Sequence, residues 1–161
     1  MQQNDKDLLL RLQNSQVEFV VIGGVCCVYH GVGMATFDLD ICCPFDEPNL
    51  QKLHAAVNDL HPFHRFTPGR LPFELTRELT PALKNLYLQT DLGKLDCLNE
   101  VAGIGNFQRV CASSIEGSLG FGTFRFLSLQ GIIRAKEATA RERDLQALIH
   151  LRAIDERTSK N

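Results

Sequence analysis

The sequence predicts a protein of the α+β (α/β-like) class, in which short strands and amphipathic helices share a core. Two observations support this prediction. Short runs rich in apolar and β-branched residues, typical of strands, occupy residues 17–22, 37–43, 85–90 and 95–98. Apolar residues at helical spacing, as expected for helices that bury one face, recur in residues 5–13, 46–60 and 128–154.

Length, composition and charge restrict the class of protein. The chain has 161 residues, of which 44% are hydrophobic and 22% are charged, as in ordinary globular proteins. The net charge of -2 and the pI of about 6.2 provide no global basic field for nucleic acid. An RNA partner would therefore need a local basic patch. We expect a single domain at residues 1–154, followed by a polar tail at residues 155–161.

Targeting signals and cysteine usage indicate a cytoplasmic protein. The sequence has no apolar run long enough to span a membrane and no signal-peptide pattern, so we expect no membrane association. Its six cysteines show neither a C-x-x-C motif nor the spacing of a zinc site. Small buried thiols are their expected role.

The N-terminal part predicts a helix, a buried strand and a second helix. The first helix covers residues 5–13, and the strand at residues 17–22 ends at Gly23 and Gly24. Glycines at this point let the backbone turn tightly into the next helix, at residues 25–30, and approach a ligand closely. The free N–H groups and positive dipole end of that helix would then face an anion such as a phosphate.

The second predicted strand carries two aspartates, Asp38 and Asp40. Because side chains alternate along a strand, both carboxylates point the same way, whereas Phe37, Leu39 and Ile41 point into the core. Two like charges side by side are unfavourable unless a positive charge lies between them. The pattern indicates a site for a divalent cation, with the Gly-Gly turn directed at a phosphate. A polar strand face in water is the alternative.

After this strand, the chain predicts a capped helix and a long connection. Asp46 is expected to cap the helix, because its carboxylate can accept a hydrogen bond from a backbone N–H of the first turn. Residues 61–81 differ in composition from the rest of the chain. They contain four prolines among histidines and arginines that include Arg65. We expect a surface loop with short pieces of strand. The alternative is that this loop lines a substrate site, since it concentrates positive charge.

A β-hairpin is predicted next, with its turn at residues 91–94, which read D-L-G-K. The second arm carries Asp96 within an otherwise apolar strand. If this arm pairs with the strand of Asp38 and Asp40, Asp96 completes a cluster of three carboxylates.

The C-terminal part predicts three helices and one or two strands. Asn106 starts a short helix, and residues 114–127 contain the strands. Ser128 caps the next helix. The last helix, at residues 141–154, is expected to direct four apolar side chains inward, namely Leu145, Leu148, Ile149 and Leu151.

Taken together, several motifs resemble the nucleotidyltransferase superfamily with the DNA polymerase β-type palm. They are Gly-Gly, a short helix ending in H-G, T-x-D-L-D-I, a later G-x-L-D, and a C-terminal A-K followed by R-x-R-D. The resemblance spans residues 20–151. Within the superfamily it is to the small bacterial nucleotidyltransferases related to the abortive-infection AbiEii toxin type. It implies a mixed β-sheet backed by helices, with further helices at the C-terminus.

This resemblance implies a role for each matched residue. Asp38, Asp40 and Asp96 would be the catalytic residues and would hold two Mg²⁺ ions. Asp96 would also help to deprotonate the attacking hydroxyl. Carboxylates suit this purpose because Mg²⁺ is a hard ion that prefers oxygen ligands. The remaining matched residues would bind the nucleotide, namely Gly23, Gly24, Thr36, Lys136 and Asp144.

The implied function is Mg²⁺-dependent transfer of a nucleoside monophosphate from an NTP to a hydroxyl acceptor, with release of pyrophosphate. The acceptor is left open between a small molecule, a tRNA and a protein, as are a protein partner and a homodimer. One departure is Met34, which stands where many relatives carry a basic residue. Lys136, Arg141 or the arginines of residues 61–81 would have to compensate. The alternative is a catalytically inactive nucleotide-binding or antitoxin-like partner-binding module of the same fold.

Overall fold

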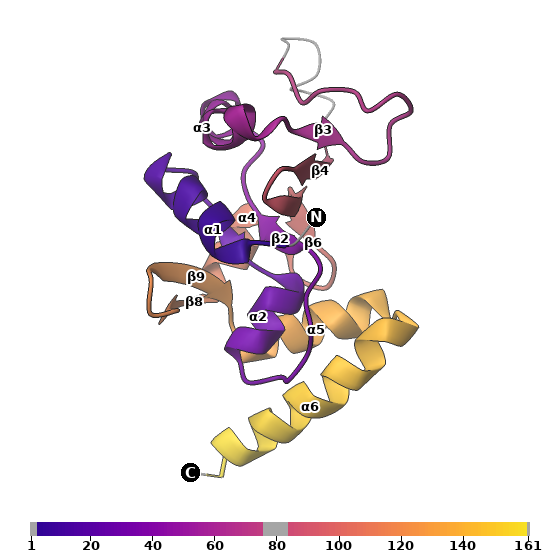
Figure 1. Ribbon diagram of the computed structural model, residues 1–161. Coiled ribbons are helices and arrows are strands. Elements are labelled where there is room, and N and C mark those ends of the chain that lie inside the picture. Colours follow the sequence, from indigo (N-terminus) through magenta and orange to yellow (C-terminus); the bar gives the residue numbers. More distant parts are fainter. Residues whose placement is uncertain (1–2, 76–83, 161) are drawn as a thin grey trace. The chain divides into compact units, whose positions relative to one another are not determined.

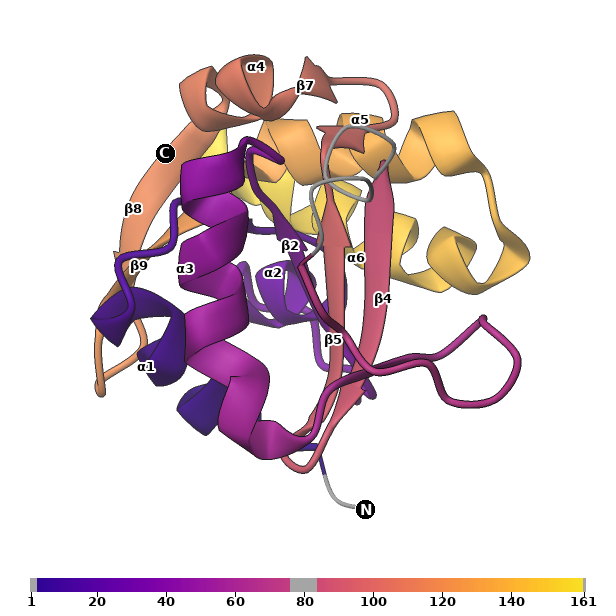
Figure 2. The same cartoon turned by 90° about the horizontal axis from the view of Figure 1, so that it is seen from above.

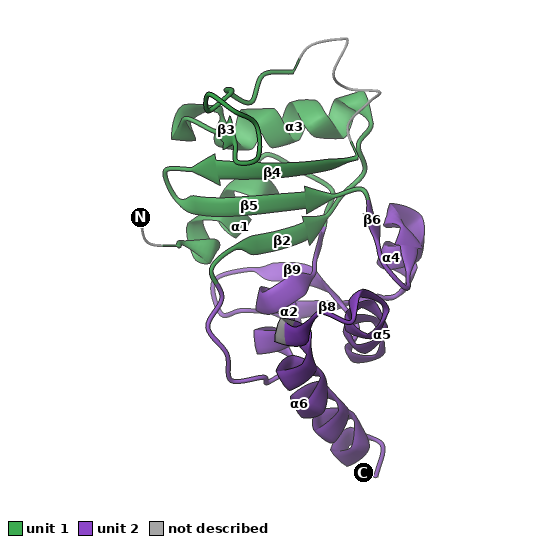
Figure 3. Cartoon of the chain, turned by 90° about the vertical axis from the view of Figure 1, so that its right-hand side faces the viewer, with its two compact units in different colours: residues 1–19, 37–99 green, residues 20–36, 100–161 purple. Residues whose placement is uncertain are grey.

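The computed structural model of the protein describes residues 3–75 and 84–160. The chain divides into two compact units, each built from two segments that are separated in the sequence. Unit 1 comprises Met1–Phe19 and Phe37–Asn99, and unit 2 comprises Val20–Thr36 and Glu100–Asn161 (Figure 3, green and purple). The expectation of one domain over residues 1–154 stays a prediction.

The described residues of unit 1 form four strands in the order β3-β4-β5-β2. The central strands β4 (Asn85–Thr90) and β5 (Gly93–Leu98) form the predicted hairpin. On one side, β3 (Phe63–His64) pairs antiparallel with β4. On the other side, β2 (Leu39–Cys42) pairs parallel with β5. The strands of unit 1 thus combine parallel and antiparallel pairing, as the mixed fold predicts.

Two helices cover one face of these strands. Figure 2 shows α1 (Asp5–Asn14) and α3 (Glu47–Val57) on the same side of β4 and β5. As predicted, Asp46 caps α3, because its carboxylate accepts a hydrogen bond from the Asn49 N–H at 2.9 Å. The core consists of fully buried side chains from the helices and the strands, including Leu8, Leu9, Leu12, Leu50, Leu53, Leu39, Ile41, Leu86, Leu88, Leu95 and Cys97.

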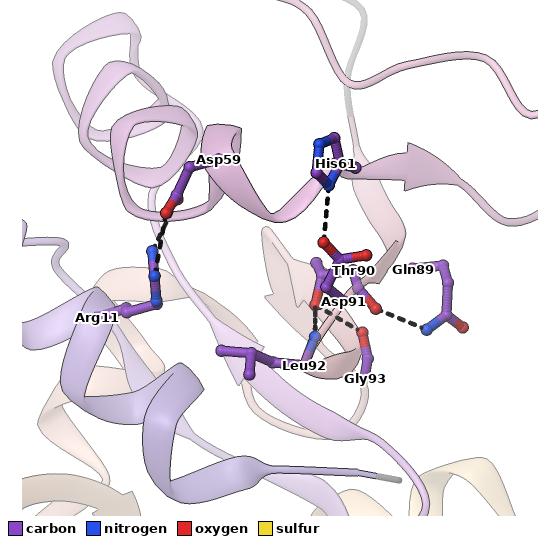
Figure 4. A network of polar contacts seen from close by, with 8 residues as sticks. All are labelled: Arg11, Asp59, His61, Gln89, Thr90, Asp91, Leu92 and Gly93. Carbon is purple, nitrogen blue, oxygen red and sulfur yellow. Dashed lines mark hydrogen bonds and ion pairs between the residues drawn. The ribbon is translucent and has the colours of Figure 1, made fainter. Parts of the chain in front are cut away.

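The turn of the β4–β5 hairpin is held by Thr90 (Figure 4). Its Oγ1 donates to the Gly93 carbonyl at 2.9 Å and accepts from the Leu92 N–H at 3.2 Å. Gly93 has a φ of +126°, which glycine adopts more readily than residues with a side chain. Beside the turn, His61 Nδ1 lies 2.7 Å from Asp91 Oδ2. The predicted turn is confirmed.

Two predictions about the first strands are wrong in detail. The strand expected at residues 17–22 is shortened to β1 (Val20–Val21), because the backbone of Glu18 binds the Asn49 side chain at 2.7 and 3.2 Å. Phe37, expected in the core, is 72% exposed. It lies in a bend before β2, where the alternation of a strand does not yet apply.

Residues 61–81 form the predicted irregular connection in the part that the structure describes. The short strand β3 is followed by coil and turns up to residue 75, with a single bridge between Phe63 and Pro72. Residues 76–83, which include Arg77 and Pro81, lie outside the described residues.

Unit 2 contains three strands in the order β1-β9-β8. The parallel pair of β1 and β9 (Thr123–Leu127) is followed by the antiparallel pair of β9 and β8 (Ser114–Ser118). A separate small hairpin joins β6 (Glu100–Val101) to β7 (Gly105–Asn106). The prediction of strands within residues 114–127 is confirmed.

The helices of unit 2 are α2 (Gly23–Tyr29), α4 (Phe107–Ala112), α5 (Leu129–Thr139) and α6 (Glu142–Thr158). Asn106 and Ser128 cap α4 and α5, as predicted, with hydrogen bonds of 3.2 and 3.1 Å. A tight turn joins α5 to α6 (Figure 1, orange to yellow). The last helix continues to Thr158, whereas the sequence predicted a polar tail from residue 155. None of the helices in the described ranges is long and apolar enough to cross a membrane.

The buried face of α6 differs from the predicted one. Leu148 and Leu151 are buried, as expected, but Leu145 and Ile149 are 51% and 61% exposed. The buried stripe of this helix includes Asp144, which lies one helical turn before Leu148. A polar residue therefore occupies a position that the apolar pattern assigned to its neighbour.

The cysteines match their expected role. All six are free thiols, five of them are buried and Cys111 is half-buried. Burial raises the pKa of Cys26, and a hydrogen bond with the Cys43 side chain, together with burial, raises the pKa of Cys97. A raised pKa keeps these thiols protonated and chemically inert.

Candidate functional site

The pairing of β2 with β5 places two of the three predicted aspartates side by side. The two strands are parallel, and their register sets Asp40 opposite Asp96. Their neighbours Leu39, Ile41 and Leu95 are fully buried. Because side chains alternate across a strand, the two carboxylates lie on the face of the sheet opposite to these core residues.

Asp38 joins this pair from the bend that precedes β2. One carboxylate oxygen from each of Asp38, Asp40 and Asp96 lies within 4.8 Å of the others. Asp96 is buried, and the other two aspartates are half-buried. Two oxygens bound to one ion at about 2.0–2.6 Å are at most roughly 5 Å apart. The three carboxylates that the sequence singled out therefore come together, and their all-oxygen donor set fits a hard divalent cation such as Mg²⁺.

A guanidinium from the loop at residues 61–81 also reaches this cluster. Arg65 directly follows β3, and a terminal nitrogen of its guanidinium donates a hydrogen bond to Asp96 Oδ1. The side chains of the pair are 15% and 11% exposed. The guanidinium carbon lies 5.2 Å from the ring centre of Phe66 and 6.0 Å from that of Tyr87. The sequence predicted Arg65 only as one of the arginines of this loop. The concentration of positive charge in residues 61–81 was the feature that pointed to a possible role at the site.

The pKa of Asp96 is raised above its ordinary value of 3.8. Burial is the largest cause, because the charged carboxylate loses hydration inside the protein. The negative charge of Asp38 acts in the same direction, whereas Arg65 and Lys94 oppose it. A buried carboxylate with a shifted pKa beside other charges is a candidate for proton transfer or cation binding.

The predicted nucleotide residues Gly23, Gly24 and Thr36 gather in unit 2. Both glycines form the first turn of α2, whereas the sequence predicted a turn ahead of that helix. Gly23 has a φ of +63°, in the left-handed region that favours glycine. A Cβ on Gly24 would lie 3.0 Å from Thr36 Cγ2, so glycine leaves room for the threonine. Contact of these residues with a nucleotide stays a prediction.

The other two predicted nucleotide residues, Lys136 and Asp144, bind each other in unit 2. Lys136 Nζ lies 2.5 Å from Asp144 Oδ1, and the Thr139 hydroxyl donates to Asp144 Oδ2 at 3.1 Å. Both side chains of the ion pair are 11% exposed. The pair ties the end of α5 to the start of α6. Its role toward a nucleotide also stays a prediction.

Met34 lies in a segment without regular secondary structure and is 39% exposed. Lys136, Arg141 or the arginines of residues 61–81 were expected to compensate for it. Lys136 is paired with Asp144, and Arg65 of the loop is paired with Asp96. Arg141 is exposed at the N-cap of α6.

Comparison with known proteins supports the fold. No protein-family model matches the chain. No curated protein matches it either. Among solved structures, the chain is similar to the crystal structure of ANT(2")-Ia, an aminoglycoside nucleotidyltransferase, in complex with adenylyl-2"-tobramycin. The TM-score is 0.56, with 14% sequence identity over 94% of this chain and 95% of that chain.

At this level of identity, the similarity establishes the fold. The protein has the mixed α/β architecture of a nucleotidyltransferase, which confirms the predicted fold class. The narrower resemblance to the abortive-infection toxin type stays a prediction.

Proposed function

We propose that the protein is a metal-dependent nucleotidyltransferase, which transfers a nucleoside monophosphate from an NTP to a hydroxyl acceptor and releases pyrophosphate. The observation that carries this proposal is the cluster of Asp38, Asp40 and Asp96, whose oxygens lie within 4.8 Å of one another. The nucleotidyltransferase fold supports it.

In this proposal, the three carboxylates would hold two Mg²⁺ ions. When bound, such ions would neutralise phosphate charge and stabilise the charge that develops during displacement at phosphorus. Asp40 and Asp96 are well suited to hold a cation in place, because they stand on paired strands rather than on a loop.

The proposed reaction joins the acceptor oxygen to the α-phosphorus of the NTP. The bond between that phosphorus and the oxygen bridging to the β-phosphate breaks, and pyrophosphate leaves with the electron pair. The proton of the acceptor hydroxyl passes to the Asp96 carboxylate. The place of Asp96 in the cluster, beside Asp38 and Asp40, supports this role.

Gly23, Gly24 and Thr36 are proposed to face the triphosphate, as the sequence resemblance implies. Gly23 has a positive φ, a backbone conformation that a side chain would disfavour. The absence of a side chain there also lets the backbone approach a ligand closely. Lys136 and Asp144 are proposed to contact the nucleotide as well. Because they bind each other at 2.5 Å, that contact requires their pair to open or to be shared with the ligand.

For the acceptor, we propose a small molecule rich in hydroxyl groups. The ANT(2")-Ia structure holds adenylyl-2"-tobramycin, which is an adenylylated small molecule. The similarity covers 94% of this chain and 95% of that chain, which supports an acceptor of the same kind. A tRNA or a protein acceptor is the competing outcome of the experiment below.

The test is incubation of the protein with Mg²⁺ and each of the four NTPs labelled at the α-phosphate. Separate reactions contain a panel of aminoglycosides, total tRNA, or cell protein as acceptor. We expect label in an aminoglycoside together with pyrophosphate release. Asp38→Ala should reduce both by at least about 100-fold, because it removes charge stabilisation at the reacting phosphate. Asp59→Ala is the matched control, since it removes an exposed carboxylate paired with Arg11 in the same unit.

Label in tRNA or protein would show that the acceptor is a macromolecule, and the proposal of nucleotidyl transfer would stand. Failure of the folded protein to turn over or bind any NTP in Mg²⁺ would contradict the proposal.

A non-catalytic nucleotide-binding module is a second candidate. Its support is the occupation of Lys136 by Asp144, which removes one of the basic groups expected to meet the phosphates. Calorimetry separates the two candidates. Nucleotide binding that is independent of Mg²⁺ and unchanged in Asp40→Asn would favour the module.

A further inference from the structure

The cluster of Asp38, Asp40 and Asp96 already contains a cation of the protein itself, Arg65. We propose that Arg65 is the resident counter-ion of this cluster and that it competes with a divalent cation for Asp96. The inference rests on the metal site of the proposed function. It adds a residue from outside the matched motifs, and it makes a prediction about the protein in the absence of any nucleotide.

The backbone brings Arg65 to Asp96 through two strand pairings. Arg65 extends the pairing of β3 and β4, because its N–H donates to the Tyr87 carbonyl at 2.8 Å. Tyr87 in turn is in register with Asp96 across β4 and β5. The position of Arg65 is therefore set by the sheet, and its side chain needs to cross only β4 to reach the carboxylate.

The contact of Arg65 with Asp96 leaves the guanidinium incompletely satisfied. The side chain is 15% exposed, and its buried Nε has no hydrogen-bond partner among the described residues. An arginine that is matched to its site donates from two nitrogens to a carboxylate in a fork. Here a terminal nitrogen donates to Asp96, and the adjacent Nε does not. The pair therefore resembles a replaceable contact more than an optimised structural one.

Two effects make Arg65 and a divalent cation compete. Both need the oxygens of the same buried carboxylate, and both are positively charged. Like charges a few ångströms apart repel strongly where water is largely excluded. Removal of the guanidinium therefore frees Asp96 and also removes the repulsion.

The Arg65 side chain has an alternative contact when a divalent cation binds Asp96. Its guanidinium already lies 5.2 Å from the ring centre of Phe66 and 6.0 Å from that of Tyr87. Aromatic faces attract cations over such distances. Phe66 is 75% exposed, so a guanidinium that moves onto this ring also gains access to water. Release from Asp96 thus requires a rotation of the side chain and no rearrangement of the strands.

The experiment is a titration of the nucleotide-free protein with Mn²⁺ alone, followed by electron paramagnetic resonance of the free ion. The variants are Arg65→Gln and the matched control Arg70→Gln. Arg70 lies in the same loop, is exposed, and stacks on Phe63 at 5.4 Å, so the control removes the same charge without touching Asp96. We expect Arg65→Gln to bind Mn²⁺ about tenfold more tightly than the wild type, because it removes the competing charge. Arg70→Gln should stay within about twofold, as expected for a screened surface charge.

Arg65→Lys provides a second variant, because a lysine keeps the charge but lacks the fork of the guanidinium. Its Mn²⁺ affinity should stay closer to that of the wild type than to that of Arg65→Gln. Thermal unfolding with and without Mn²⁺ shows whether Arg65→Gln has lost stability. That variant should unfold at a lower temperature without metal and should gain more from Mn²⁺ than the wild type gains.

The outcomes separate this inference from the proposed function. One outcome is that the wild type binds Mn²⁺ with millimolar or better affinity and Arg65→Gln binds it equally or more weakly. That outcome overturns the competition but leaves the proposed metal site intact. No Mn²⁺ binding by the wild type or by Arg65→Gln overturns both.

Discussion

Each unit of the molecule contains a buried ion pair, and the two pairs differ in how well they are satisfied. In unit 2, Lys136 and Asp144 are both 11% exposed. In unit 1, Arg65 and Asp96 are 15% and 11% exposed. By burial alone the two pairs are equivalent.

Their surroundings set them apart. One oxygen of Asp144 binds Lys136 at 2.5 Å, and the other lies 3.1 Å from the Thr139 hydroxyl. Asp96 instead lies beside the carboxylates of Asp38 and Asp40, and the Nε of its arginine has no partner within the described part of the chain. Removing one partner of a balanced buried pair destabilises a fold, because the other charge stays buried without compensation. An excess of negative charge around one cation instead favours the binding of another. The comparison supports the proposal that the acidic cluster of unit 1 binds a divalent cation, and it predicts that the pair in unit 2 also stabilises the fold.

The largest expected effect tests the structural pair. Asp144→Ala should lower the free energy of unfolding by about 3–5 kcal/mol, because it leaves the Lys136 ammonium buried without a partner. Urea denaturation measures this loss. Asp155→Ala is the control on the same helix, since Asp155 is only half-buried and accepts one hydrogen bond from Gln130. A loss for Asp144→Ala no larger than that of the control would remove the structural role.

A smaller effect of opposite sign is expected in the acidic cluster. Asp38→Asn should raise the stability of the metal-free protein by about 1 kcal/mol, because it relieves repulsion between close like charges. In saturating Mn²⁺ the sign should reverse, since the variant loses a ligand and with it the stabilisation by bound metal. Urea denaturation in EDTA and in Mn²⁺ shows both signs, with Asp59→Asn as control. A variant that is less stable than the wild type in EDTA would contradict the excess of negative charge.

The smallest effect concerns pH. Burial raises the pKa of Asp96 above 3.8, so the folded chain holds this proton more tightly than the unfolded chain does. Stability of the metal-free protein should therefore fall as the pH rises from 3.8 through the raised pKa of Asp96. Urea denaturation from about pH 4 to about pH 6 in EDTA measures the slope, which other carboxylates share. The contribution of Asp96 is the difference between the wild type and Asp96→Asn, and identical slopes would contradict it.

Local signals in the sequence were sufficient for most elements of the fold. The caps Asp46, Asn106 and Ser128 were predictable because a short polar side chain bonds to a backbone N–H a few residues away. Such an interaction needs no knowledge of distant residues. Phe37 was misplaced for a related reason, since alternation predicts an inward side chain only where the chain is already part of a strand.

The candidate site was predictable only in part. The alternation around Asp38 and Asp40, and the isolated Asp96, marked residues that would be costly in a core without a cation. Arg65 carried no comparable signal, because it stands in a proline-rich connection with no period. Its pairing with Asp96 depends on the register of β3, β4 and β5, which joins residues 31 positions apart.

The sequence by itself determined the class of elements, the helix caps and the three carboxylates, because these follow from side-chain chemistry and from periods of two or about 3.6 residues. Only the tertiary structure decided which charges meet. It paired Lys136 with Asp144 and placed Arg65 on Asp96 beside Asp38. Coulomb energies depend on distance and burial, and neither can be read from position along the chain.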